Sequence, residues 1–310
     1  MKISIIEPLE LPKKEVLNEF NSIDAEIRYH NTPPRSEEEL IKRCSGAQII
    51  VLVNQQLPSQ VIEEIDQTEL ISVSFTGYDH IDIEKAEEEG IAVTNIPEYA
   101  TASVAELVFG LAISLLRKLR ICDKEVRDEV DEKRSNLKGN ELRNKNLGII
   151  GTGKIGSKVA EMGKKLGMDI IAYSNTVNPE IEDYTTYLPL REVLEKSDIV
   201  SLHVPLTKQT KEMIGERELN HMKPDSVLIN TARAHVIEKQ AFIDAVRNKS
   251  IKFGVDVPHS NLPQDVKESD QVIYAPHIGY YTHEALKKRL KTTVNNIKKF
   301  IEDERQNRVV

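Results

Sequence analysis

Short runs of apolar and β-branched residues alternate along the chain with segments whose apolar positions recur every three or four residues. In the first hundred residues the short runs predict four strands, over Ile3–Ile6, Glu26–Tyr29, Gln48–Val53 and Leu70–Phe75. The helical spacing between them predicts helices over Pro12–Phe20, Ser36–Arg43 and Pro58–Ile65. Strands that alternate with helices indicate βαβ units, in which helices cover both faces of a parallel sheet.

The same alternation resumes after a charged middle segment. Apolar runs predict six further strands, over Leu147–Ile150, Asp169–Tyr173, Asp198–His203, Ser226–Asn230, Lys252–Val257 and Gln271–Tyr274. The charged segment itself, Arg117–Arg143, is more typical of a solvated helix and connector than of a binding tail. At 310 residues, the chain is long enough for two α/β domains, each with its own core.

The charge balance narrows the range of partners. The chain has 42 Lys and Arg against 50 Asp and Glu, a formal net charge of −8, whereas nucleic-acid and anionic-membrane binders need a basic surface. We therefore expect no nucleic-acid partner and no membrane partner, although backbone amides can still bind a phosphate locally. The most apolar stretch, Val104–Leu116, is too short to span a bilayer.

The cysteines and histidines give no sign of a metal centre. Cys44 and Cys122 cannot form a disulfide framework, and nothing near them resembles a zinc site. The histidines show no ligand spacing either, so we expect no metal. Since the N-terminal residues lack the long apolar region of a signal peptide, these features favour a cytoplasmic protein.

Three glycines follow the first strand of the second series at the spacing G-x-G-x-x-G. They open a helix predicted over Ile155–Leu166, which leads into the strand Asp169–Tyr173. This is the setting of a dinucleotide-binding loop, where glycines permit a tight turn, backbone approach to a pyrophosphate and close helix–strand packing. Free N–H groups at the helix N-terminus favour the anion. The residues expected to hold the coenzyme here are Gly151, Gly153, Lys154, Ile155 and Gly156.

The strand Asp169–Tyr173 does not end in the Asp or Glu that usually holds the ribose hydroxyls of NAD. Ser174 and Asn175 follow it instead, and we expect both to contact the coenzyme. No carboxylate is present to repel a 2′-phosphate, and no adjacent Arg or Lys to pair with one. The specificity therefore leans to NADP but leaves NAD open, because a basic residue from a distant loop could change the balance.

Four more segments occur in the order found in one protein family. They are Ala100-Thr-Ala-Ser-Val-Ala-Glu-Leu107, Asn230-Thr-Ala-Arg233, Gly254-Val-Asp-Val257 and Ala275-Pro-His-Ile-Gly279. With the glycine loop, they resemble the D-isomer-specific 2-hydroxyacid dehydrogenases, the group that includes D-lactate, phosphoglycerate, glyoxylate/hydroxypyruvate and formate dehydrogenases. The segments 203–210 and 222–230 also resemble parts of this family, so the likeness covers nearly the whole chain.

The resemblance implies an α/β architecture with one domain inserted into the other. A Rossmann-type NAD(P)-binding domain, residues 100–283, would interrupt a flavodoxin-like substrate domain, residues 1–99 and 284–310, with the chemistry between them. Because the family is commonly dimeric through the coenzyme domain, a homodimer is expected. The implied activity is NAD(P)-dependent oxidoreduction, a reversible hydride transfer between the nicotinamide coenzyme and a small 2-oxo acid or D-2-hydroxy acid.

The resemblance also implies roles for individual residues. Arg233 would bind the carboxylate and keto oxygen of the substrate, and His277 would be the general acid in reduction and the general base in oxidation. The backbone amides of Thr76, Gly77 and Tyr78 would hold the substrate carboxylate from the other domain. Coenzyme contacts are expected from His203, Pro205, Thr210, Thr231 and Asp256, the last of which would orient the nicotinamide carboxamide.

One position near these residues departs from the family pattern. The family places a Glu five residues after the Asp of its G-x-D-V segment, as the partner of the catalytic His, but Asn261 stands five residues after Asp256. An amide can orient an imidazole but does not favour its protonated form as a carboxylate does. Asn261 is therefore the expected partner of His277, unless the loop folds so that Asp265 or Glu268 takes the place.

The missing Glu leaves two other functions open. The C-terminal-binding-protein corepressors share this fold and bind partner peptides, so a dinucleotide-sensing protein with little turnover is one alternative. Formate dehydrogenases have an amide beside the His because their reaction needs no proton transfer, so a formate-type dehydrogenase is the other.

Overall fold

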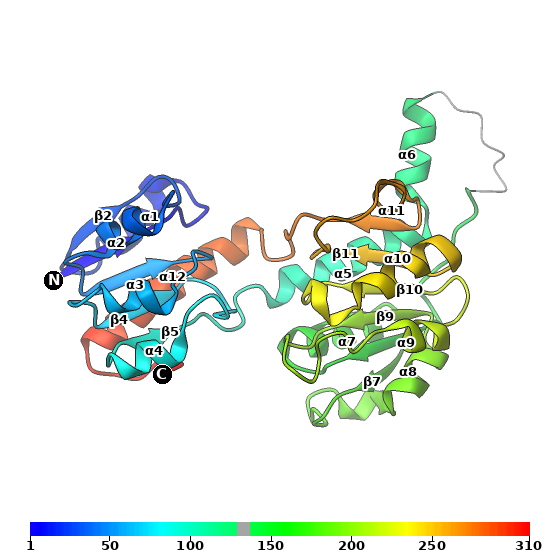
Figure 1. The fold of residues 1–310 in the computed structure, drawn as a ribbon. Helices are drawn as coiled ribbons and strands as arrows, with labels where there is room; N and C mark the ends of the chain where they lie inside the picture. The colour runs from blue at the N-terminus through cyan, green and yellow to red at the C-terminus, as the bar shows by residue number, and fades with distance from the viewer. Residues whose placement is uncertain (129–136) are drawn as a thin grey trace. The chain divides into compact units, whose positions relative to one another are not determined.

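Two parallel sheets organise the protein in a computed structural model that describes residues 1–128 and 137–310. Each sheet belongs to its own unit (Figure 1). The first unit comprises Met1–Tyr99 together with Thr282–Val310, and the second comprises Ala100–Tyr281. The chain thus leaves the first unit, builds the second and returns.

The first unit holds a five-stranded sheet with the order β2-β1-β3-β4-β5, in which every pair is parallel. Its strands are β1 (Lys2–Ile5), β2 (Glu26–Tyr29), β3 (Ile49–Leu52), β4 (Leu70–Val73) and β5 (Ala92–Thr94). Every residue of β3 and β4 is buried, as expected for central strands covered on both faces. This is the flavodoxin-like strand order, with its switch point between β1 and β3.

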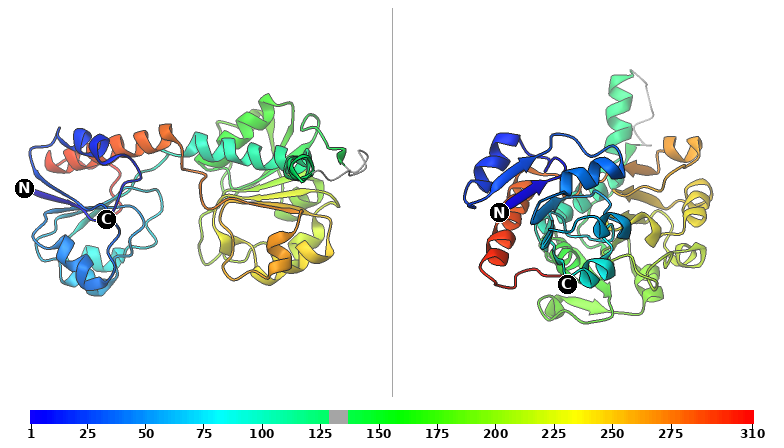
Figure 2. Two further views of the ribbon diagram at one scale, coloured as in Figure 1. Left: turned by 90° about the horizontal axis from the view of Figure 1, so that it is seen from above. Right: turned by 60° about the vertical axis from the view of Figure 1, so that its left-hand side comes forward.

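Helices cover both faces of this sheet. They are α1 (Lys13–Phe20), α2 (Glu37–Cys44), α3 (Ser59–Glu63), α4 (Ile83–Glu88) and the C-terminal α12 (His283–Ile301). Figure 2 shows α1 and α12 together on one face and α3 and α4 on the other. After α12 the chain end runs beside β5, where the backbone of Val93 exchanges hydrogen bonds with Val309 and Val310.

The second unit holds a seven-stranded parallel sheet with the order β12-β11-β10-β9-β6-β7-β8. The strands are β6 (Asn146–Ile150), β7 (Asp169–Tyr173), β8 (Thr185–Tyr187), β9 (Ile199–Leu202), β10 (Val227–Asn230), β11 (Lys252–Val255) and β12 (Val272–Tyr274). The order reverses between β6 and β9. In open α/β sheets, ligands bind at the carboxyl ends of the strands at such a switch point.

Two apolar cores, one on each face, hold this sheet between its helices. The helices are α5 (Thr101–Leu116), α6 (Leu119–Arg127), α7 (Lys154–Lys165), α8 (Leu190–Lys196), α9 (Glu216–His221), α10 (Lys239–Asn248) and α11 (Gln264–Glu268), with short 3₁₀ turns η2 (Glu182–Tyr184) and η3 (Ala234–Val236). Leu147 and Ile149 of β6 pack with α5 and α7, while Ile150 joins the opposite core with α8–α10. The alternation follows from the two-residue period of a strand.

The predicted fold class is confirmed, since one sheet has the Rossmann-type order and the other the flavodoxin-like order. The predicted strands are present to within two residues at either end, but β5 and β8 were not predicted. In the charged segment Arg117–Arg143, α6 has no buried residue; residues 129–136 of that segment lie outside the described residues. Across the described ranges, no helix has the length and apolarity needed to cross a bilayer.

Candidate functional site

The glycine loop between β6 and α7 lies at the switch point of the seven-stranded sheet. Gly151 has φ +94°, and a β-carbon there would lie 2.7 Å from the carbonyl oxygen of His203. A β-carbon on Gly156 would lie 2.0 Å from the carbonyl oxygen of Gly151. On Gly153, by contrast, it would meet nothing within 4 Å. Two glycines are therefore needed for packing, and the third leaves open space at the start of α7.

The open space at Gly153 lies at the N-terminus of α7, which is suited to bind an anion. Gly153 is the N-cap of α7 and no side chain caps the helix, so Lys154, Ile155 and Gly156 occupy its first turn. N–H groups of a first turn lack intrahelical acceptors and carry partial positive charge. The loop thus has the open space and the N–H groups that a pyrophosphate site requires, and the coenzyme contacts expected here stay a prediction.

The residues after β7 lie beside this loop. The N–H of Gly151 donates to the carbonyl oxygen of Tyr173, the last residue of β7, at 2.8 Å. Ser174 and Asn175 follow directly, Ser174 half-buried and Asn175 exposed. They follow the strand next to the glycine loop, and their contacts with the adenosine ribose stay a prediction.

The segment after the carboxyl end of β9 also contacts the glycine loop. The N–H of His203 donates to the carbonyl oxygen of Ile150 at 2.7 Å, which places His203 against the start of the glycine loop. Burial lowers the pKa of His203 to about 3, and its Nε2 shares a 2.8 Å hydrogen bond with Ser201 Oγ. His203 is therefore a neutral group. The Thr210 hydroxyl donates to the Pro205 carbonyl and accepts from the Thr207 N–H, so it closes the 205–210 loop on itself.

The turn after β10 carries Arg233 and is built by Asn230. The buried Asn230 side chain accepts from the Ala232 N–H at 3.0 Å and donates to the Arg233 carbonyl at 2.9 Å. Arg233 is half-buried, and its Nη1 donates to the Ala232 carbonyl at 2.9 Å. A guanidinium has five donors in a fork that matches a carboxylate, so it can serve a substrate as well as this carbonyl. The sequence reasoning gave Asn230 no role, although it stands inside the motif that contains Arg233.

The hydroxyl of Thr231, in the same turn, has no hydrogen-bond partner among the described residues. Its Oγ1 is buried and makes no hydrogen bond with any residue of the described ranges. Because a buried polar atom without a partner is costly, it indicates a position that a polar ligand would satisfy. Together with the open space at Gly153, it shows that the residues present fit a dinucleotide.

The segment that carries His277 is held by Asp256. Asp256 is 2 % exposed, and its two carboxylate oxygens accept from the N–H groups of Ile278 and Gly279 at 2.8 and 3.0 Å. Its carbonyl oxygen accepts from the His277 N–H at 2.7 Å. A β-carbon on Gly279 would lie 2.8 Å from the carboxylate, so this close approach requires glycine. Asp256 thus positions the His277 segment, a role that the sequence reasoning did not foresee.

His277 itself adopts an unusual backbone conformation. Its φ is +57°, in the left-handed region that residues other than glycine rarely adopt. Such a conformation persists where the surroundings hold it, and it gathers at functional sites. The imidazole lies edge-on to the ring of Tyr280, with ring centroids 5.4 Å apart. The exposed His277 is therefore fixed at its backbone and packed at its ring.

No hydrogen bond joins Asn261 to His277 in the described part of the chain. Asn261 is exposed, has φ +53° and forms no hydrogen bond with the described part of the chain. Both oxygens of Asp265 accept from Arg247, at 2.7 and 3.0 Å, and Glu268 accepts from Gln264 at 2.6 Å. The two alternative carboxylates are thus engaged elsewhere.

In the first unit, the loop Thr76–Tyr78 follows β4. The Thr76 hydroxyl donates to the carbonyl of Ile96, and Asn95 donates to the carbonyl of Thr76, both at 2.8 Å. The N–H groups of Thr76, Gly77 and Tyr78 donate to no residue within 1–128 or 137–310. The loop is thus anchored through its oxygens and leaves its N–H groups for an anion.

The neighbouring loop after β3 is closed to an external anion. The N–H groups of Val53, Asn54 and Gln55 all donate to one oxygen of the buried Glu7, at 2.7, 2.9 and 2.8 Å. Successive N–H groups of this kind form an anion-binding nest, and here the chain's own carboxylate fills it. Glu7 was missed in the sequence, where an acidic residue directly after the first strand was the available signal.

No metal site accompanies these residues. In residues 1–128 and 137–310, no three His, Cys, Asp or Glu side chains gather as a metal would require.

Comparisons with known proteins agree with this arrangement. A family model described as "D-isomer specific 2-hydroxyacid dehydrogenase, NAD binding domain" matches residues 109–279. The glyoxylate reductase of Thermococcus litoralis is 38% identical over 269 residues, which are 83% of this chain and 81% of that protein.

Solved structures give the same result over the full length. An acyclic imino acid reductase in complex with NADPH and D-Arg has a TM-score of 0.91 and 29% identity, with all of both chains covered. A D-lactate dehydrogenase from Aquifex aeolicus, complexed with NAD and lactic acid, has a TM-score of 0.84 and 29% identity, with 98% of this chain and 96% of that chain covered. The chain belongs to the D-isomer-specific 2-hydroxyacid dehydrogenase family.

Proposed function

We propose that the protein is an NAD(P)-dependent reductase of a small 2-oxo acid, which it converts reversibly to the D-2-hydroxy acid. The observation that carries this proposal is His277, held by Asp256 in a left-handed conformation in a chain of this family. Relatives named glyoxylate reductase and hydroxypyruvate reductase support the same substrate class. They give no support to a corepressor-like protein or a formate-type dehydrogenase.

Arg233 and His277 divide the work on the substrate. The Arg233 guanidinium binds the carboxylate and draws electron density from the keto oxygen. When bound, NAD(P)H would supply a hydride for the carbonyl carbon. His277 donates a proton to the keto oxygen, which gives the hydroxyl group, and takes that proton back in the oxidation direction. Arg233 and His277 are thus the residues assigned to the chemistry.

The two units divide the ligands. Residues 100–281 hold the coenzyme through the glycine loop, Ser174, Asn175 and the loops at His203 and Thr231. Residues 1–99 and 282–310 form the substrate domain, two residues longer at its second start than the sequence indicated, where the N–H groups of Thr76–Tyr78 bind the carboxylate. In the second unit, the carboxylate of Asp256 holds the His277 segment. Asn261 is exposed and has no hydrogen bond within the described residues, so it would partner His277 only after its loop moves.

The purified protein tests this function directly. Glyoxylate, hydroxypyruvate, pyruvate and branched 2-oxo acids are each mixed with NADH or NADPH, and the loss of reduced-coenzyme absorbance is followed. We expect turnover with at least one of these acids and faster reaction with NADPH, because Ser174 leaves room for a 2′-phosphate. No turnover with any acid, in protein that binds coenzyme, would count against the proposal.

We further propose a homodimer formed through the coenzyme domain. No residue of α6 is buried, and Leu119 and Val126 are 49% and 80% exposed. With Cys122, they recur at the spacing of one helix face, which is typical of a helix that packs against a partner. Light scattering should give the mass of two chains, and Val126→Asp should reduce it to one. A single-chain mass for the unchanged protein would exclude the dimer.

A cytoplasmic location is the last element of the proposal. Cys44 and Cys122 are free in the structure, as is usual in a reducing compartment. Fractionation of cells that express the tagged protein tests it.

A further inference from the structure

One side chain ties the loop after β7 to the glycine loop. The amide nitrogen of Asn178 donates to the carbonyl oxygen of Thr152 at 3.0 Å and to the hydroxyl of Ser157 at 2.7 Å. Thr152 lies between the first two glycines of the motif, and Ser157 is in the first turns of α7. Asn178 therefore reaches across 26 and 21 residues of sequence to the centre of the coenzyme loop.

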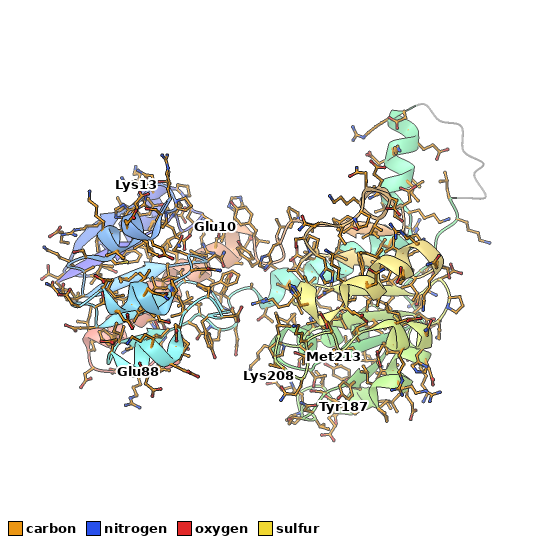
Figure 3. The ribbon with its side chains drawn as sticks, in the orientation of Figure 1. Glu10, Lys13, Glu88, Tyr187, Lys208 and Met213 are labelled. Atoms are coloured by element: carbon orange, nitrogen blue, oxygen red, sulfur yellow. The ribbon has the colours of Figure 1, made fainter. Side chains whose placement is uncertain are left out.

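Asn178 is itself held in place from two sides. Its side-chain oxygen accepts from the N–H of Glu180 at 2.9 Å, which forms a local turn. Its own N–H donates to the phenol oxygen of Tyr187 on β8, which Figure 3 labels, at 3.0 Å. The amide hydrogens are thus aimed at the glycine loop by a residue whose backbone and side-chain oxygen are both fixed.

The Thr152 carbonyl receives two hydrogen bonds, from Asn178 and, at 2.9 Å, from the Ser157 hydroxyl. In a planar trans peptide the C=O and the following N–H point in opposite directions. Fixing the Thr152 oxygen toward Asn178 and Ser157 therefore turns the N–H of Gly153 away from them. Gly153 is the residue beside which a β-carbon would meet nothing within 4 Å.

We propose that Asn178 is a positioning residue for the coenzyme, which sets the orientation of the 152–153 peptide and so prepares the glycine loop for the pyrophosphate. The inference rests on the proposed coenzyme site. Its physical basis is preorganisation, since a loop already held in its binding conformation loses less entropy when the ligand arrives.

Asn178→Asp separates this role from that of a local turn. The aspartate has the same shape and keeps an oxygen for the Glu180 N–H, so the turn survives. It replaces the donating NH₂ by an oxygen that faces the Thr152 carbonyl, which removes the donors and adds repulsion. Val177→Asp, at the neighbouring 45% exposed position, adds the same charge without removing a bond and is the matched control.

Calorimetric titration with NAD and NADP measures the effect, and thermal denaturation checks folding. We expect Asn178→Asp to raise the coenzyme Kd about tenfold or more at neutral pH, and Val177→Asp to change it less than about threefold. In the assay, the coenzyme KM should rise in parallel, while kcat at saturating coenzyme and the KM of the 2-oxo acid stay unchanged. Acidification should restore part of the affinity, because a protonated carboxyl group donates again.

An Asn178→Asp variant that binds coenzyme as tightly as the unchanged protein would overturn the inference. If that variant does not fold, Ser157→Ala decides instead. It removes one of the two donors to Thr152, so it should raise the coenzyme Kd a few-fold, and an unchanged Kd would overturn the inference. Failure of the unchanged protein to bind either coenzyme is a different result, which overturns the proposed function itself.

Discussion

The backbone N–H of His277 donates to the carbonyl oxygen of Asp256 at 2.7 Å, so the residue assigned to proton transfer is tied at its backbone to a buried acid. The carboxylate of Asp256 binds the next two N–H groups of the same segment. Three hydrogen bonds to one residue thus hold His277 in its left-handed conformation. The side chain proposed for proton transfer thus stands on a strained backbone that Asp256 maintains.

Asp256→Asn should lower kcat about tenfold or more and leave the coenzyme Kd nearly unchanged. The amide offers one acceptor oxygen where the carboxylate offers two, so at least one charge-assisted bond is lost, and stability should fall by about 1–3 kcal/mol. Steady-state kinetics, coenzyme titration and urea denaturation measure the three quantities. A large rise in coenzyme Kd with normal kcat would instead assign Asp256 to the nicotinamide carboxamide.

Two alanine substitutions in the glycine loop should affect different properties, one the stability of the fold and the other the affinity for coenzyme. Gly156→Ala places a β-carbon 2.0 Å from the Gly151 carbonyl oxygen, so it should destabilise the fold by about 3 kcal/mol. Gly153→Ala meets no protein atom within 4 Å, so it should fold normally. Its β-carbon enters the space expected for the pyrophosphate, and the coenzyme Kd should rise about tenfold or more. Denaturation and calorimetry on both variants check this pair, and equal loss of stability in both would contradict it.

The coenzyme half of the site could be predicted from the sequence because its signals are local. The strand before Gly151, the glycines and the helix after them stand within twenty residues. Gly151 and Gly156 have steric reasons in the structure, whereas a β-carbon on Gly153 would meet no protein atom within 4 Å. The short strands β5 and β8 were not predicted. Each has three residues, too few for a period, and each exists because a longer neighbouring strand offers it hydrogen bonds.

The hydrogen bonds that hold the site in place could not be predicted. Asn178 and Glu7 act across 21 to 48 residues of sequence, and no local pattern reveals which N–H groups will face a side chain. At Asn261, by contrast, a local pattern indicated a contact that the structure does not form. Its spacing from Asp256 indicated a partner for His277, but its loop places it at the surface.

Asn261→Glu tests whether that loop can still supply the missing carboxylate. A carboxylate beside the imidazole favours the protonated form, which reduction requires, so the upper limb of the pH–rate profile should move to higher pH. Because Asn261 has φ +53°, the substitution should cost about 1 kcal/mol of stability. Asn261→Gln, which has the same length without the charge, is the control. If the upper limb of the pH–rate profile stays at the same pH, the side chain at position 261 does not reach His277.

His203 should make the fold less stable in acid. Its pKa is about 3 in the folded protein, against an ordinary histidine pKa of 6.5 in the unfolded chain. Above pH 6.5 neither state binds a proton here, but between about 6.5 and 3 the unfolded state binds one that the folded state does not. Stability should therefore fall by about 2 kcal/mol between pH 6.5 and 5 through this group. In His203→Gln, the free energy of unfolding measured with urea should fall less between pH 6.5 and 5. The same pH dependence in the variant and the unchanged protein would contradict this role of His203.

The central claim is that Arg233 and His277 perform the chemistry while other residues hold the coenzyme. The measurement that tests it most directly is kcat/KM for the best 2-oxo acid in Arg233→Lys and His277→Gln, with the coenzyme Kd determined on the same samples. We expect kcat/KM to fall at least about a hundredfold in each variant, with the coenzyme Kd within about twofold of the original. Activity within a few-fold of the unchanged protein in either variant would contradict the assignment of that residue.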